Sequence, residues 1–155
     1  MHSRRLRSTL RLIALAAWTL WSGGFAFYGA FVIDAAHHVL GEHTTVGFIT
    51  QRVTLAEHGT LAAALGISAL VAALRAAPRT RLFVASWIAA ALGLAAMALM
   101  HRHLGAFLDQ EARIILDRTT FYARHRIYIA TATIAWLAGL VHAWVLIEHP
   151  NSTEV

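Results

Sequence analysis

Hydrophobic residues are concentrated in four long runs, at residues 12–33, 53–74, 82–100 and 127–147. Each run has roughly the 20 residues that a helix needs to cross about 30 Å of hydrocarbon. The alternation of barrel strands is absent, and the runs are about twice as long as such strands. The pattern predicts one all-α integral membrane domain over residues 1–155, a four-helix transmembrane bundle.

The connections between the runs carry further signals. Pro78 in "RAAPRT" predicts a tight break between the second and third spans, because proline cannot continue a helix. Between the third and fourth spans, apolar residues recur at spacings of three and four, with charged residues opposite. This stripe predicts an amphipathic helix that extends span three or lies along the interface; its members are Leu104, Phe107, Leu108, Ala112 and Ile115.

Composition and charge agree with a membrane location. The chain is 58% hydrophobic and 14% charged, too little polar surface for a soluble domain of 155 residues. It has no cysteine, which excludes disulfides and thiolate metal sites. All 13 of its Lys and Arg residues are Arg, and they fall between the apolar runs rather than on one basic face. We therefore expect the lipid bilayer as a partner and no nucleic acid.

The distribution of Arg predicts the orientation. Arg4, Arg5, Arg7 and Arg11 precede the first span, and Arg75, Arg79 and Arg81 crowd the short turn after the second. Short loops rich in Arg remain in the cytoplasm, so both termini are predicted to be cytoplasmic. The first apolar run is too long for a cleaved signal and is expected to remain as an anchor.

Small residues and one histidine predict how the helices pack. Ser22, Ala26 and Ala30 in span one, and Thr131, Ala135 and Gly139 in span four, form two faces on which helices can approach closely. His142 follows Gly139 by three residues, deep in span four. We expect it to be a packing histidine, hydrogen-bonded at the depth of Ser68 and Ser86, with proton relay or ligation as the alternative.

Histidines collect at the end of the bundle opposite the termini. In "DAAHHVLGEH", span one is expected to continue as helix to Leu40 and to stop at Gly41, so that Asp34, His37 and His38 share a face. The predicted topology places His43, His58, His101, His103 and His125 on the same side. The candidate metal ligands are His38, His58 and His101, supported by Asp34, His37, Glu57, Met97 and His125.

Two interpretations of these histidines remain open. Nitrogen ligands suit copper, zinc or haem iron, and methionine sulfur suits copper(I), so copper and haem b are the candidate cofactors. Alternatively, the histidines are only the polar edge of membrane helices. An enzyme with Glu57 and His58 as an acid-base pair is disfavoured, because adjacent helical residues point about 100° apart.

Three stretches, "WSGGFAFYGAF", "TTVGFITQRVT" and "FYARHRIY", resemble motifs of the transmembrane-protein-205-like domain family of small four-helix membrane proteins. Gln51 and Arg52 match the polar pair of its second motif, and Phe121 and His125 match the aromatic residue and histidine of its third. The family's proline before the second helix is replaced here by "VTLAEH", and its Asn-Leu after the last motif by "IATATIAW". The chain is also distantly similar to CopD-like proteins, some of which handle copper or bind haem.

The resemblance implies a four-helix membrane protein without an assigned reaction. The first functional hypothesis is accordingly a non-catalytic membrane protein, acting as a homo-oligomer or as a component of a larger membrane complex. The alternative is a membrane metal- or haem-binding protein with histidine ligands near the outer face.

Overall fold

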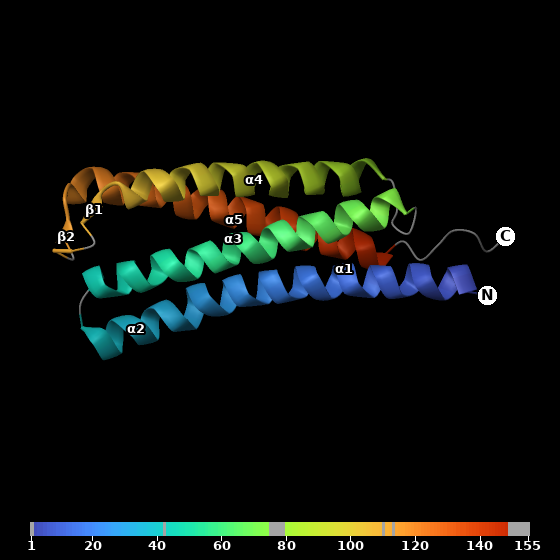
Figure 1. The fold of residues 1–155 in the computed structure, drawn as a ribbon, viewed down its shortest axis with the longest axis horizontal. Helices are drawn as coiled ribbons and strands as arrows, with labels where there is room; N and C mark the ends of the chain where they lie inside the picture. The colour runs from blue at the N-terminus through green and yellow to red at the C-terminus, as the bar shows by residue number, and fades with distance from the viewer. Residues whose placement is uncertain (1, 42, 75–79, 110, 113, 149–155) are drawn as a thin grey trace.

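The computed structural model describes residues 2–41, 43–74, 80–109, 111–112 and 114–148, and within them it is an all-α four-helix bundle, as predicted (Figure 1). The first rod begins as α1 (His2–Phe27) and continues through a π-helical turn, η1 (Tyr28–Val32), into α2 (Ile33–Leu40). The other rods are α3 (His43–Ala73), α4 (Arg81–Gly105) and α5 (Arg118–Glu148).

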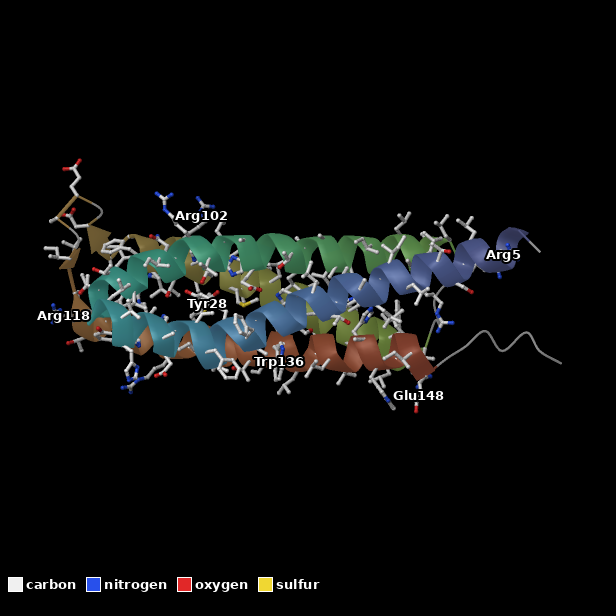
Figure 2. The ribbon with its side chains drawn as sticks, turned by 90° about the horizontal axis from the view of Figure 1, so that it is seen from below. Arg5, Tyr28, Arg102, Arg118, Trp136 and Glu148 are labelled. Atoms are coloured by element: carbon white, nitrogen blue, oxygen red, sulfur yellow. The ribbon has the colours of Figure 1, made fainter. Side chains whose placement is uncertain are left out.

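The arrangement places the two ends of the chain together. The start of α1 and the end of α5 lie at one end of the bundle, and α2 lies at the other (Figure 1). Figure 2 shows Arg5 and Glu148 near the first end and Arg118 at the second. Helices α3 and α5 each pack against both α1 and α4, so that α1 and α4 are diagonal to one another.

All four rods are long and apolar enough to cross a membrane. Helix α3 has 31 residues, which at 1.5 Å per residue is about 46 Å, longer than the roughly 30 Å of hydrocarbon. Large apolar side chains cover its outer surface and those of the other helices; Leu20, Leu92 and Ile134 are 64 to 70% exposed. Such a surface is suited to lipid rather than water, which identifies a multi-pass membrane protein.

Helix ends follow recognised capping chemistry. As predicted, the first rod ends at Gly41, whose φ of 63° is the left-handed conformation that glycine adopts without strain. At the start of α4, the Thr80 hydroxyl accepts a hydrogen bond from the backbone N–H of Phe83 at 3.1 Å. Pro78 and the predicted tight break at residues 75–79 lie outside the described residues.

Asp117 performs the equivalent role before α5. Its Oδ1 accepts a hydrogen bond from the backbone N–H of Thr120 at 3.1 Å. Hydrogen bonds from Thr120 hold the pKa of the Asp117 carboxyl below its ordinary value of 3.8, because they stabilise the charged form.

The prediction of an amphipathic helix between the third and fourth spans is wrong. Helix α4 ends at Gly105, and two short antiparallel strands follow, β1 (Leu108–Asp109) and β2 (Ile114–Ile115), with Leu108 paired to Ile115. The Asp109 carboxylate accepts hydrogen bonds from the backbone N–H groups of Glu111 and Ala112 at 3.0 and 2.9 Å. A side chain that bonds its own backbone in this way stabilises a turn in competition with helix.

The core combines tryptophan rings with glycine. Trp18 and Trp21 of α1 are buried and meet edge to face with ring centroids 5.6 Å apart. They cover Gly139 of α5 so closely that a Cβ there would lie 2.4 Å from Trp21 and 2.8 Å from Trp18. Trp18 also donates a hydrogen bond from Nε1 to the hydroxyl of Ser68, at 2.7 Å. These contacts fix α1 against both α3 and α5.

The predicted small-residue faces are found only in part. Ser22 is buried, and its carbonyl accepts a hydrogen bond from Trp136 Nε1 at 3.1 Å, but Ala26 and Ala30 are exposed. Ala135 faces α4 instead of α1, where a Cβ on Gly93 would lie 2.6 Å from its own Cβ. The closest helix approach through small residues is therefore between α4 and α5.

His142 is a packing histidine, as predicted. It is fully buried, its Nδ1 lies 3.1 Å from the hydroxyl of Ser86, and its ring lies between those of Trp18 and Phe83. The Ser86 hydroxyl also lies 3.1 Å from the Phe83 carbonyl. Because that hydroxyl donates to the carbonyl, it accepts from the Nδ1–H of His142.

Candidate functional site

A partly enclosed cavity of about 230 Å³ lies at the end of the bundle that carries the hairpin. We call it the hairpin-end cavity. All four rods and the hairpin contribute to its wall. The lining residues are Ile33, His37, Thr44, Val46, Gly47, Thr50, Gln51, Thr54, His101, Leu104, Gly105, Leu108, Ile115, Phe121, Tyr122, His125 and Tyr128.

The position of the cavity follows from the hydropathy pattern. Its lining residues come from the ends of the apolar runs and the polar segments that continue them, between residues 33 and 54 and between 101 and 128. The helices are longer than the hydrocarbon is thick, so these segments are expected to extend beyond the apolar core of the bilayer. On this basis we expect the cavity to lie at the level where hydrocarbon gives way to headgroups.

Buried polar contacts support the inner part of the wall. His58 of α3 is 8% exposed, and its Nε2 lies 3.0 Å from the hydroxyl of Tyr128 on α5. The Thr54 hydroxyl is a second hydrogen-bonding partner of Tyr128. On the other side of His58, the ring of His101 from α4 meets it edge to face, with centroids 5.5 Å apart. Three helices thus hold one connected group of polar rings.

Two successive turns of α5 supply a row of flat rings. The rings of Phe121 and His125 are stacked with an interplanar angle of 8°, and those of His125 and Tyr128 with an angle of 9°. The three residues follow one another at spacings of four and three, which places them on one helix face. All three line the cavity, so this wall presents aromatic surface together with one imidazole and one phenol.

The π-helical turn sets which residues of the first rod reach the cavity. Tyr28 donates a hydrogen bond from its hydroxyl to Thr50 at 3.0 Å, and Thr50 donates to the Val46 carbonyl at 2.8 Å. Ile33 follows Tyr28 by five residues and His37 follows Ile33 by four, and both line the cavity. A spacing of five is that of a π-turn, a feature that often occurs at functional sites.

The three predicted metal ligands lie in different surroundings. His58 and His101 are the edge-to-face pair beside Tyr128. His38 is exposed at the surface of α2, where its Nδ1 lies 3.2 Å from the backbone carbonyl of Asp34 and 3.8 Å from its carboxylate. The described residues contain no group of three or more His, Asp or Glu side chains placed to hold a metal ion. The metal site stays a prediction.

The predicted supporting residues are also divided. His37 and His125 line the cavity, and Asp34 is exposed. Met97 is buried in the core of the bundle. Glu57 turns toward α1, where its Oε1 lies 3.3 Å from the position of a Cβ on Gly24. Nothing is described of the side chain of His43.

Most cavity residues had no site role in the sequence interpretation, and two of them matter most. Tyr128 was not singled out as a site residue, yet it lies between His58 and His125. Gly47 was not singled out, although it lines the cavity. The usable signal for Tyr128 was its place seven residues after Phe121, since residues seven apart share a helix face.

Fold and site together define a class: a polytopic membrane protein of four spanning helices with a small cavity at one end of its bundle. No family model, no curated protein and no solved structure matches the chain.

Proposed function

We propose that this protein is a non-catalytic integral membrane protein that binds a small molecule in the hairpin-end cavity. The observation that carries the proposal is the lining itself, in which polar side chains from three rods meet an aromatic wall inside a recess. A concave, mostly apolar site with a few converging polar groups is the usual form of a small-molecule site.

A binding role is favoured over a catalytic one by the chemistry of the lining. Histidine and tyrosine can exchange protons, but the described lining has no carboxylate and no activated nucleophile beside them. The Glu57 carboxylate, the acidic half of the acid-base pair considered from sequence, packs against Gly24 at the α1–α3 contact instead.

The size of the cavity restricts the ligand. Small-molecule sites usually measure about 300–1,000 Å³, and this cavity measures about 230 Å³. An engineered cavity of about 150 Å³ holds a benzene molecule. The proposed ligand is therefore the size of one substituted ring, and a haem macrocycle of four pyrrole rings does not fit the cavity in this form.

Native mass spectrometry of protein released gently from its own membrane tests the proposal. Gly47→Leu places a side chain at a lining position where an added Cβ meets no atom within 4 Å. Gly59→Leu is the matched control, because Gly59 lies on the same helix, is equally open and does not line the cavity. We expect wild type and Gly59→Leu to carry a small-molecule adduct that Gly47→Leu lacks. Identical adducts in all three proteins contradict the proposal.

Metal binding is the second candidate function, and the His58–His101 pair favours it. Two histidine rings 5.5 Å apart supply two nitrogen donors, whereas a structural site has four ligands and a catalytic site at least three protein ligands. A His58→Ala, His101→Ala double variant should lose any copper or zinc that wild type binds, while the exposed His38→Ala should not. Equal metal content in all three proteins rules out a site at this pair.

The orientation is part of the proposal. Arg5 and Arg7 lie at the start of α1, and Arg81 lies at the start of α4, at the same end of the bundle. Dense arginine close to spanning helices stays on the cytoplasmic side. We therefore propose that both termini are cytoplasmic and that the hairpin-end cavity faces the outer side of the membrane.

A further inference from the structure

We infer that the hairpin-end cavity binds the ring of a lipid-soluble quinone. This inference rests on the proposed function, since it names the class of ligand for the same cavity. It follows from four properties of the described lining: its charge, its shape, the placement of its hydrogen-bond donors and its depth in the bilayer.

The lining favours a neutral ligand. None of the described lining residues is an arginine, an aspartate or a glutamate. The nearby cations point elsewhere: Arg52 and Arg102 are exposed, and the guanidinium of Arg124 lies over the ring of Phe107 at 5.2 Å. A phosphate or carboxylate ligand would require a cationic partner in the wall, because an unpaired charge is costly to bury.

The wall formed by α5 favours a flat ligand. The rings of Phe121, His125 and Tyr128 form its stacked row. Aromatic rings pack well against one another in offset or edge-to-face arrangements. On other sides of the cavity, Val46, Leu104 and Leu108 supply apolar surface. A single planar ring with small apolar substituents matches these surfaces and the cavity volume.

His101 supplies a hydrogen-bonding group to the lining from α4, a different helix from the one that carries the aromatic row. A neutral imidazole carries one N–H donor. A carbonyl oxygen of a quinone is an acceptor for such a donor. Durene and other pure hydrocarbons of similar shape lack such an acceptor.

The pair of His58 and Tyr128 can serve both redox forms of such a ring. Their hydrogen bond of 3.0 Å leaves open which partner donates. If His58 donates to the phenol oxygen, the Tyr128 hydroxyl can donate to a quinone carbonyl; if the hydroxyl donates to His58, the phenol oxygen can accept from a quinol. Binding of either form requires no electron transfer by this protein.

The depth of the cavity suits a ligand delivered by the membrane. At the expected depth, the edge of the hydrocarbon, the polar ring of a quinone can enter the cavity while its apolar tail remains among lipid chains. Enrichment of such a ligand in the bilayer raises its concentration at the site. The absence of cysteine from the chain also means that no thiol can add to a bound quinone.

The inference is tested by calorimetric titration of the full-length protein in detergent with duroquinone and with durene. The two compounds share a tetramethyl ring, but only duroquinone has carbonyl oxygens. We expect duroquinone to bind at least tenfold more tightly, the effect of a single net hydrogen bond of about 1.4 kcal/mol. Equal affinities for the two compounds overturn the quinone assignment and leave the cavity as an apolar site.

Variants locate the binding. Gly47→Leu should abolish duroquinone binding, and Gly59→Leu should preserve it. His101→Phe, which keeps a ring of similar size, should weaken duroquinone binding about tenfold and leave durene unaffected. If circular dichroism shows that Gly47→Leu does not fold, the His101→Phe variant still tests the inference.

The two proposals can fail separately. If wild type binds neither compound, yet its native adduct disappears in Gly47→Leu, the quinone inference is wrong and the proposed function stands. If duroquinone binds equally to wild type, Gly47→Leu and His101→Phe, the ligand lies elsewhere and the inference is likewise overturned.

Discussion

Replacing Gly139 by alanine tests the packing of α1 against α5 most directly. The added Cβ would lie 2.4 Å from Trp21 and 2.8 Å from Trp18, whereas carbon atoms pack best at about 3.5–4.0 Å. One ring must therefore move by about 1 Å. Neither can do so easily, because both are buried and Trp18 is held by its 2.7 Å hydrogen bond to Ser68.

The expected magnitude follows from two opposing effects. Overpacking a well-filled core costs about 1–3 kcal/mol, and alanine is favoured over glycine inside a helix by about 1 kcal/mol. Because the added methyl group would overlap two buried rings, we take the upper part of this range, about 2–3 kcal/mol, as the overpacking cost. The free energy of unfolding of Gly139→Ala should therefore be about 1–2 kcal/mol lower than that of wild type. Gly66→Ala is the control, because an added Cβ there meets nothing within 4 Å. It should be neutral or more stable by up to about 1 kcal/mol.

The assay is reversible unfolding in mixed micelles with increasing sodium dodecyl sulfate, followed by circular dichroism and tryptophan fluorescence. Gly139→Ala should unfold at a lower detergent fraction than wild type, and Gly66→Ala at the same or a higher fraction. Ordinary surface substitutions change the free energy of unfolding by about 0.5 kcal/mol or less. If the free energies of unfolding of the two variants differ by less than this, the close contact between the Trp18–Trp21 pair and α5 is refuted.

Three further predictions concern other parts of the molecule. Ser68→Ala should lower the free energy of unfolding by about 1 kcal/mol in the same assay, because Trp18 loses its buried hydrogen-bond acceptor; an unchanged value contradicts that bond. Asp117→Ala should remove a contribution to stability that is complete above pH 3.8 and declines as the pH falls through the lower pKa of the folded state, so wild type and variant should converge in acid. If the stabilities of wild type and Asp117→Ala move apart as the pH falls, the proposed role of the Asp117 carboxylate is contradicted. Reporter fusions after residues 45 and 78 should report opposite sides of the membrane, and the same side for both excludes the four-span topology.

Hydropathy predicts the existence and order of the spanning helices, but not their ends. The apolar run at residues 12–33 lies inside a rod that extends from His2 to Leu40. A helix continues past the hydrocarbon wherever its backbone remains hydrogen-bonded. Many residues of this continuation are polar, so a search for apolar runs does not detect them. The end at Gly41 was predictable because a left-handed glycine is a local signal.

The segment between α4 and α5 shows where periodicity misleads. Leu108 and Ile115 fit a helical stripe, but they are also placed correctly for a hairpin, in which they face one another. The deciding interaction is local: Asp109 accepts two backbone N–H groups and closes the turn. Spacings of three and four over a dozen residues do not reveal such a bond.

The candidate site was predictable at the level of its region. Topology places His58, His101 and His125 near one end of the bundle, and the structure brings the first two into contact. Which histidine of the first rod faces inward was not predictable. An ideal α-helix gives no reason to expect a π-turn, and nothing in "YGAFV" distinguishes it from the helix on either side.

The π-turn between Tyr28 and Val32 makes the lining of the cavity depend on a local helix conformation that a sequence comparison would not reveal. A π-turn holds one residue more than the α-turn it replaces. Deleting Gly29 would restore an α-turn and leave Ile33 and His37 on the same face, whereas converting the turn to α-helix with no residue removed would rotate residues 33–41 by about 100° relative to α1. In the second case the cavity would receive the methyl group of Ala36 in place of the imidazole of His37. In this part of the molecule, the conformation of one helical turn decides which side chain faces the ligand, and the π-turn allows the chain to hold one more residue without changing that side chain.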